Sequence, residues 1–350
     1  MTFQCASARQ GKMTLTDEIL SSLHLADKTG LWGTLGTIKP LRNFEPDADV
    51  ERLHDTLTNK GNVQTVIDTV TNLDNEQRQE VVRLYKEEMQ QDLIDNVKKA
   101  LSGDLERVIT GLLKTPAAYD AEELRLAMKG LGTDEATLTE ILSTRSNEQL
   151  HKIQACYREE YKTELEKHIA ADTSEPFTGL LLALAKGKRE KESVIIDYGL
   201  IEQDAKVLTS DLGPKNSPNI AQWITIFTER PKGHLRRVFD SYKKITSEDI
   251  EDGIKKHFKG DLQKALFTLV AVIKDTPLYF ADKLHNSMKG LGTDDKALIR
   301  ILISRSEEDL LSIRVAYRKK YGKSLYSSIQ SDTKGDYRMA LLLLCRAEDI

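Results

Sequence analysis

Apolar residues recur along the chain at the spacing that favours α-helices. Val81 is followed four residues later by Tyr85, and Leu93 is followed four residues later by Val97. Side chains four residues apart lie on one face of a helix, so each pair marks an apolar helical face. The alternation that marks a β-strand is nowhere sustained. The pattern therefore predicts an all-α fold of short amphipathic helices.

The same pattern occurs four times in register. Aligned on Asn75, Asn147, Lys232 and Glu307, every copy has a tyrosine at one offset: Tyr85, Tyr157, Tyr242 and Tyr317. Three further columns are apolar in every copy: Val81, Ile153, Val238 and Ile313; Leu93, Leu165, Ile250 and Leu325; Val97, Ile169, Ile254 and Ile329. One irregular domain with chance periodicity does not explain this agreement. We expect an N-terminal arm over residues 1–44 and helical repeats over 45–116, 117–188, 199–275 and 276–350.

A glycine turn is repeated without change. The string MKGLGTD occurs at Met128–Asp134 and again at Met288–Asp294. A helix should end at Gly130 or Gly132, because glycine adopts positive φ at little steric cost. Thr133 would then cap the next helix, with acidic residues in its first turn. Taken alone, the string is explained by a helix–turn–helix corner.

An aspartate accompanies each of these turns at a distance along the chain. One aligned column reads Ala100, Asp172, His257 and Asp332, and the two repeats with MKGLGTD are the two with aspartate. Repeat 1 has TLTNKGN at the turn and repeat 3 has GPKNSPN. An aspartate that only capped a helix would have no reason to accompany a distant glycine turn. The two features therefore indicate one shared site.

Calcium chemistry explains why a turn and an acid would occur together. Ca²⁺ takes six to eight oxygen ligands, including backbone carbonyls and carboxylates. A glycine-rich turn can present several carbonyls at one point, and a carboxylate from another corner completes the set. Such a site should be weak alone and leave positions for water or a phosphate headgroup. The rival calcium motif, the D-x-[DN]-x-[DN]-G loop of an EF-hand, is absent.

Charge and composition fit a membrane contact bridged by a cation. The 350 residues carry a formal net charge of −4, which does not favour an anionic membrane without a bridging cation. Lys129 and Lys289 lie inside the turns and could add phosphate contacts. No basic stretch dominates, so nucleic acid is not the expected partner. No apolar run is long enough to span a bilayer.

No catalytic motif accompanies these features. The seven histidines are scattered without zinc or triad spacing, and no P-loop or dinucleotide fingerprint is present. Cys5, Cys156 and Cys345 show no disulfide framework, and the N-terminus lacks a signal-peptide pattern. We expect a cytoplasmic protein that is not an enzyme and that joins plasma or endosomal membranes when calcium rises. Secretion without a signal peptide stays open.

These residues resemble the annexin family. Four helical repeats, MKGLGTD, the TRS and SRS stretches around Arg145 and Arg305, and the distant aspartates carry the resemblance. It covers about residues 44–350. The resemblance implies a curved disc of four five-helix repeats, with calcium and phospholipid bound on the convex face.

By position, the resemblance implies two main calcium sites. In repeat 2 the ligands would be the carbonyls of Met128, Gly130 and Gly132 and the carboxylate of Asp172. In repeat 4 they would be the carbonyls of Met288, Gly290 and Gly292 and the carboxylate of Asp332. Weaker sites would involve Thr133 with Glu135, and the Lys98 and Leu101 carbonyls with Glu106. Ala100, His257 and Ser217-Pro218 depart from the family pattern, so repeats 1 and 3 should lack the main site.

The N-terminal arm contains one amphipathic segment, TLTDEILSSLHL. It places four apolar side chains on one helical face: Leu15, Ile19, Leu20 and Leu23. So short a helix is marginal alone, and a segment folded back on the core or disordered is the simpler alternative. The arm resembles that of an annexin that binds a dimeric EF-hand light chain, and the resemblance also raises actin as a partner. A calcium-independent helical scaffold that binds a protein through this helix is the alternative function.

Overall fold

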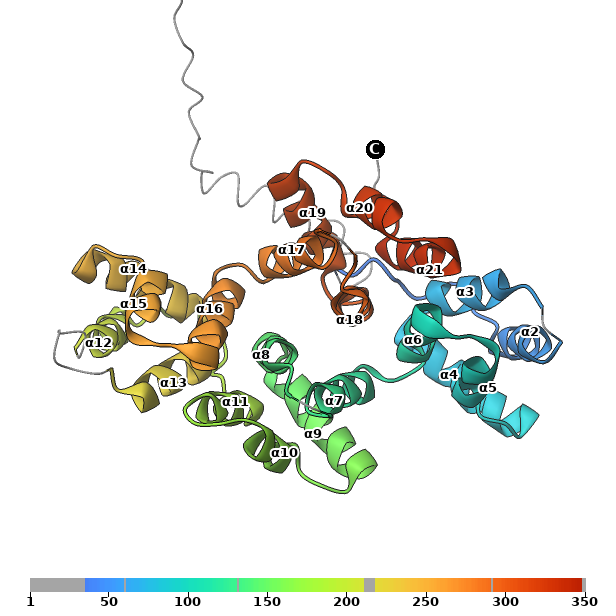
Figure 1. Ribbon diagram of the computed structural model, residues 1–350, viewed down its shortest axis with the longest axis horizontal. Helices are drawn as coiled ribbons and strands as arrows, with labels where there is room; N and C mark the ends of the chain where they lie inside the picture. The colour runs from blue at the N-terminus through green and yellow to red at the C-terminus, as the bar shows by residue number, and fades with distance from the viewer. Residues whose placement is uncertain (1–34, 60, 131, 211–217, 291, 348–350) are drawn as a thin grey trace, which may run out of the picture.

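The described part of the chain comprises residues 35–59, 61–130, 132–210, 218–290 and 292–347 of a computed structural model (Figure 1). Within it lie twenty α-helices and no β-strand, in four groups of five that we call repeats 1 to 4. Repeat 1 comprises α2 (Pro46–Thr58), α3 (Val63–Asn72), α4 (Asn75–Met89), α5 (Leu93–Ala100) and α6 (Gly103–Leu112). Repeat 2 comprises α7 (Pro116–Ala127), α8 (Glu135–Thr144), α9 (Asn147–Tyr161), α10 (Leu165–Asp172) and α11 (Phe177–Ala185).

The other two groups follow the same order. Repeat 3 comprises α12 (Tyr198–Thr209), α13 (Ile220–Glu229), α14 (Lys232–Thr246), α15 (Ile250–His257) and α16 (Gly260–Lys274). Repeat 4 comprises α17 (Thr276–Ser287), α18 (Asp295–Arg305), α19 (Leu310–Tyr321), α20 (Leu325–Asp332) and α21 (Gly335–Cys345). The all-α prediction and the fourfold repetition are confirmed.

Side chains fix the starts of the third helices in repeats 1 and 2. The Asp74 carboxylate accepts from the amide of Gln77 at 3.0 Å, and the Gln77 side chain accepts from the amide of Asp74 at 3.3 Å. Ser146 and Gln149 form the same reciprocal pair at the start of α9. Each capping box satisfies two backbone donors that the first helical turn leaves unpaired.

The aligned apolar columns form the interior. Three of the column tyrosines, Tyr85, Tyr157 and Tyr242, are fully buried, and Tyr317 is 2% exposed. The other three apolar columns are buried in every repeat. Burial of this apolar surface is the main favourable contribution to folding.

Two separate apolar cores divide the molecule into pairs of repeats. One core joins repeats 2 and 3, and it includes Tyr157 and Tyr242. The other joins repeats 1 and 4, and it includes Tyr85, Tyr317 and Ile38. The amide of Ile38 donates to the carbonyl of Ser306 at 3.0 Å, which fixes the start of the described chain against repeat 4.

A buried ion pair connects these two halves at the centre. Nε of Arg300 on α18 lies 2.9 Å from Oε1 of Glu140 on α8, and both side chains are almost fully buried. Lys283 approaches the same carboxylate at 3.6 Å. Although burial alone would raise it, Arg300 and Lys283 hold the pKa of Glu140 below its usual value.

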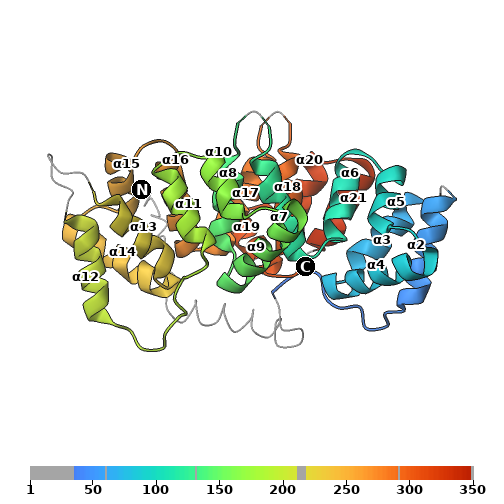
Figure 2. The ribbon, with the colours of Figure 1, turned by 90° about the horizontal axis from the view of Figure 1, so that it is seen from below.

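The molecule has two distinct faces. Seen edge-on, the α7–α8 and α17–α18 connections project from one face, while the α11–α12 linker runs along the opposite face (Figure 2). In the described residues, no helix is long and apolar enough to cross a membrane. The repeated turns are therefore presented together on one side of the disc.

Candidate functional site

The first glycine turn begins earlier than the sequence suggests. Helix α7 ends at Ala127 with Met128 as its C-cap, before either glycine. Gly130 and Gly132 have φ values of +113° and +95°, and a Cβ built at either position would meet nothing within 4 Å. Glycine is therefore needed for the backbone conformation and not for space. The amide of Asp134 donates to the carbonyl of Ala127 at 2.8 Å and closes the turn.

The turn in repeat 4 has the same backbone. Gly290 and Gly292 have φ values of +107° and +92°, again with open space beside each α-carbon. The amide of Asp294 donates to the carbonyl of Ser287 at 2.7 Å. Identical sequence thus gives the same glycine conformations and the same closing hydrogen bond in two separate repeats.

Each turn lies against the aspartate that accompanies it in the sequence. Asp172 and Asp332 are the last residues of α10 and α20. Oγ1 of Thr133 donates to the main-chain oxygen and to Oδ2 of Asp172, both at 3.0 Å. Oγ1 of Thr293 donates to Oδ2 of Asp332 at 2.6 Å. The structure therefore brings turn and acid together in both repeats.

The expected role of Thr133 as a helix cap is wrong. The N-cap of α8 is Asp134, whose carboxylate accepts from the amide of Thr137 at 3.0 Å and from its hydroxyl at 2.7 Å. Although burial acts in the opposite direction, these two hydrogen bonds from Thr137 lower the pKa of Asp134. The hydroxyl of Thr133 is directed to Asp172 instead, a contact that the sequence pattern did not reveal.

Repeats 1 and 3 place other residues at the corresponding point. Ala100 ends α5 and His257 ends α15, so neither corner supplies a carboxylate there. The connection between α2 and α3 spans only residues 59–62, whereas seven residues connect α7 to α8. In repeat 3, Ser217 lies outside the described residues and Pro218 inside them.

The donor set at the two turns fits Ca²⁺ better than a metal held by side chains alone. Among the described residues, no group of three or more His, Cys, Asp or Glu side chains could hold a metal ion. A site at these turns would therefore use backbone carbonyls together with one carboxylate. Oxygen-only ligands of this kind are what Ca²⁺ prefers. The glycines leave the space beside the backbone open for an ion and its outer ligands.

The residues expected at weaker sites occupy the corner of the first glycine turn and the α5–α6 corner of repeat 1. Thr133 and Glu135 line a cavity of about 360 Å³ between α8 and α16, with Asp261 on its far side. Lys98 lies in the last turn of α5, Leu101 caps that helix, and Glu106 lies in the first turn of α6.

The remaining expected contact residues are exposed or undescribed. Lys129 and Lys289 are exposed in the turns, and their contact with a phosphate stays a prediction. The arm residues Leu15, Ile19, Leu20 and Leu23 lie outside the described residues, so their role stays a prediction.

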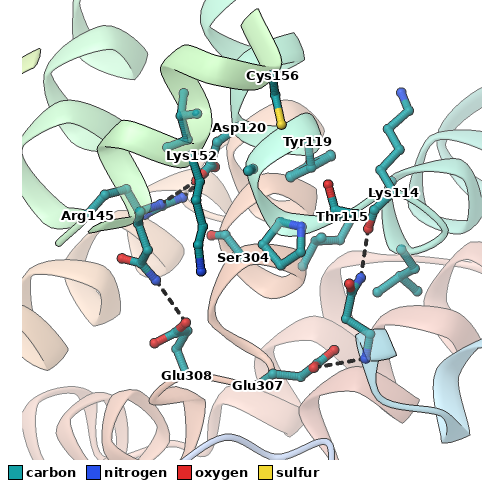
Figure 3. Close-up of a pocket in the computed structure, with 18 of the residues that line it drawn as sticks. Lys114, Thr115, Tyr119, Asp120, Arg145, Lys152, Cys156, Ser304, Glu307 and Glu308 are labelled. Atoms are coloured by element: carbon teal, nitrogen blue, oxygen red, sulfur yellow. Dashed lines mark hydrogen bonds and ion pairs between the residues drawn. The ribbon is translucent and has the colours of Figure 1, made fainter. Parts of the chain in front are cut away.

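A larger cavity, of about 550 Å³, lies between repeats 1, 2 and 4 (Figure 3). Arg145 and Asp120 form a buried ion pair at its wall, with Nε and Oδ2 2.6 Å apart. Cys156 also lines it, and burial followed by the charge of Glu159 raises the pKa of its thiol. That thiol is therefore protonated at neutral pH and is a poor nucleophile.

Comparisons with known proteins agree with this geometry. The annexin family model matches residues 48–112, 119–184, 203–269 and 279–344. Annexin A9 of Homo sapiens is 47% identical over 347 residues, which cover 98% of this chain and 100% of that protein. The structure of annexin III superposes with a TM-score of 0.87 at 38% identity, covering 90% of this chain and 98% of that one. The calcium-bound structure of annexin (Sm)1 gives a TM-score of 0.78 at 32% identity, covering 89% and 93%.

These relatives also bear on which member of the family the chain resembles. The repeats and the arm suggest annexin II, the calpactin heavy chain, as the most similar member. Annexin A9 of Mus musculus is 46% identical over 338 residues, which cover 96% of this chain and 97% of that protein. The comparisons therefore support the family and not that particular member.

Proposed function

Because the chain belongs to the annexin family, we propose that it binds anionic phospholipid membranes through calcium held at the turns of repeats 2 and 4. Membership of this family implies calcium-dependent phospholipid binding in general, and annexins are not enzymes. The observation that carries the proposal is the contact between each glycine turn and its aspartate. Thr133 joins the first turn to Asp172, and Thr293 joins the second to Asp332.

Each site would use three carbonyls from the glycine turn and one carboxylate from the end of another helix. The ligands in repeat 2 would be Met128, Gly130, Gly132 and Asp172, and those in repeat 4 would be Met288, Gly290, Gly292 and Asp332. Bound Ca²⁺ would join these oxygens to a lipid phosphate. The chain's own part is to hold the carboxylate beside the turn, keep the glycine backbone open and offer Lys129 and Lys289 to the headgroup.

Two sites on one rigid body bind a membrane better than one. Both turns project from the same face (Figure 2). Once the first turn is attached, the second meets lipid at a high effective concentration, so two weak sites give strong overall attachment. The corners that contain Glu135 and Glu106 would add weaker calcium binding, while Ala100 and His257 leave repeats 1 and 3 without the main site.

Attachment of this kind would make the protein a peripheral organiser of membranes. Linking of membranes and a part in trafficking follow from reversible attachment when calcium rises. A light-chain partner on the arm helix and a contact with actin remain predictions. The alternative is a calcium-independent scaffold, in which the glycine turns are only corners.

Vesicle sedimentation separates these two functions. The full chain is mixed with phosphatidylserine vesicles over a calcium titration, and each point is repeated with excess chelator. We expect the protein to pellet with vesicles as calcium rises and to return to the supernatant with chelator. Vesicles of phosphatidylcholine alone serve as the control for lipid charge. Pelleting that persists in excess chelator would favour the calcium-independent scaffold.

A further inference from the structure

A cavity of about 530 Å³ lies between repeats 2, 3 and 4, and it takes no part in the proposed calcium sites. It is bounded by the α8–α9 corner, the linker after α11, the start of α14 and the end of α18. The linker runs along the face opposite the glycine turns (Figure 2). Six cationic side chains line the cavity: Arg145, Lys188, Arg189, Lys191, Lys232 and Arg305.

Two of these six cations are already neutralised. Arg145 donates through two nitrogens to the carboxylate of Asp120, at 2.6 and 2.7 Å (Figure 3). Nε of Arg305 donates to Oδ1 of Asp309 at 2.7 Å. These two pairs are structural, because each arginine is buried and held by its own carboxylate.

The other four cations have no carboxylate within ion-pair distance among the described residues. The guanidinium of Arg189 donates to the carbonyls of Arg230 and Phe227, at 2.7 and 2.9 Å. Nζ of Lys232 donates to the hydroxyl of Thr276 at 3.2 Å. Lys188 and Lys191 are exposed at the rim. Neutral oxygens therefore satisfy part of the hydrogen bonding, and the carboxylates of Glu192 and Asp309 act on Arg189 and Lys232 only from beyond ion-pair distance.

Two of the three acids that line the cavity pair with cations, and the third accepts from a neutral amide. Glu148 pairs with Lys152 at 2.7 Å, and Glu190 pairs with Arg230 at 3.1 Å. Glu308 accepts from the side chain of Gln149 at 3.0 Å (Figure 3). The cavity thus has an excess of positive charge, although the whole chain carries a formal net charge of −4.

Lys232 carries a charge where its aligned counterparts in repeats 1 and 2 carry a neutral amide. Its aligned counterparts Asn75 and Asn147 each donate to a main-chain carbonyl at 2.7 Å, so an amide suffices to brace this corner. Burial, together with the charges of Arg189 and Arg305, lowers the pKa of Lys232 to about 8. Holding a cation in such surroundings costs free energy, which a bound anion would recover.

We propose that this cavity binds an anion with several phosphate groups, through Lys188, Arg189, Lys191 and Lys232. Lysine and arginine recognise phosphate by charge-assisted hydrogen bonds, and four such groups suit more than one phosphate. The volume is in the range of sites for small molecules. This function goes beyond the proposed calcium-dependent one, since it needs no calcium and uses the other face.

The same phosphate chemistry could come from a soluble polyphosphate or from a polyphosphorylated lipid headgroup. The linker beyond Lys191 exposes Val194 and Ile195, which are 100% and 83% exposed. A pair of exposed aliphatic side chains beside a cationic cavity would enter the lipid interface if the headgroup were bound. These two residues therefore provide a way to distinguish the sources.

Calorimetry in the presence of EGTA tests the cavity directly, with inositol hexakisphosphate as the probe. The triple variant Lys188→Gln/Lys191→Gln/Lys232→Gln should bind at least about tenfold more weakly than wild type. Arg189 is left intact because it braces the linker. The matched control, Lys167→Gln/Lys206→Gln/Lys244→Gln, removes the same charge from exposed positions outside the cavity. It should bind within about twofold of wild type, a difference well under 1 kcal/mol.

Two outcomes would overturn the proposal. One is no binding of the probe at millimolar concentration, and the other is equal weakening in both triple variants, which would indicate general charge attraction.

Vesicles containing phosphatidylinositol bisphosphate, again in EGTA, then identify the source of the anion. If Val194→Ser/Ile195→Ser abolishes pelleting and retains binding of the probe, the result supports a lipid headgroup. Probe binding without pelleting supports a soluble anion. Asp172→Asn/Asp332→Asn should leave both readouts unchanged, so failure of the calcium sites is distinguishable.

Discussion

The hydroxyl of Thr133 lies 3.0 Å from Oδ2 of Asp172, across a corner that brings together two distant parts of repeat 2. The corresponding pair in repeat 4, Thr293 and Asp332, is 2.6 Å apart. In both repeats the threonine is the residue that follows the second glycine. A direct contact of this kind explains why turn and acid occur together in the sequence.

Removal of the threonine hydroxyls should weaken calcium-dependent attachment. In Thr133→Val/Thr293→Val the carboxylates lose the donor that holds them beside the turns. A hydrogen bond to a charged group contributes about 1.5 kcal/mol or more, so the calcium needed for half-maximal vesicle pelleting should rise by about tenfold. Thr133→Ser/Thr293→Ser keeps the donor and should behave like wild type. An unchanged calcium requirement in the valine variant would show that the hydroxyls do not position the acids.

Substitution of the turn glycines should affect the calcium requirement for pelleting more than it affects thermal stability. Gly132→Ala/Gly292→Ala forces an alanine toward positive φ, at a cost of order 1 kcal/mol per site, while its methyl group meets no neighbour within 4 Å. We expect a small loss of thermal stability and a marked rise in the calcium needed for pelleting.

A second positive-φ glycine gives the matched control for this change. Gly322 ends α19 with φ +68° and also has no neighbour within 4 Å of a built Cβ. Gly322→Ala should cost about half the stability that the double variant loses, since it changes one site instead of two, and should leave the calcium requirement unchanged. If both alanine variants lowered calcium-dependent pelleting alike, the effect would come from general destabilisation.

The central ion pair should contribute stability that depends on pH. Glu140→Gln leaves Arg300 buried with only the more distant carboxylate of Glu123, at 3.7 Å, as a charge partner, which should cost about 3 kcal/mol at neutral pH. Because the folded pKa of Glu140 lies below its usual value of 4.5, this contribution is present above that pH and is lost as pH falls through the folded pKa. Urea unfolding at pH 7 and at pH 3.5 checks both statements.

The control for that experiment is an exposed acid. Glu148 pairs with Lys152 on the surface, so Glu148→Gln should not change the urea midpoint at either pH. A gap between Glu140→Gln and wild type that stayed equally large at pH 3.5 would contradict the assignment of the pH dependence to Glu140.

The fold followed from the sequence because its signal is repeated. Four tyrosines in register with apolar columns predict the buried faces, and all four tyrosines are buried. The aspartate column likewise predicted which acids meet the glycine turns. Both features lie at aligned positions of the four repeats, so chance agreement does not explain them.

Contacts that depend on how separate corners or halves of the molecule meet were not predicted. The pair of Arg300 with Glu140 depends on how two halves of the molecule meet, which periodicity within a repeat does not encode. Local capping rules favour Thr133 as a helix cap, whereas its actual partner, Asp172, comes from another corner. Lys232 shares an aligned position with Asn75 and Asn147 in the sequence, but only the fold brings the charge of Arg189 close to it.

The central claim is that two turn-and-aspartate pairs hold the calcium that binds the membrane. Its most direct test compares pelleting with phosphatidylserine vesicles for wild type, Asp172→Asn, Asp332→Asn and the double variant over one calcium titration. His257→Asn, at the same position of repeat 3, is the control. Each single variant should need more calcium, the double variant should need the most, and His257→Asn should match wild type. A double variant that pellets at the wild-type calcium concentration would contradict the claim.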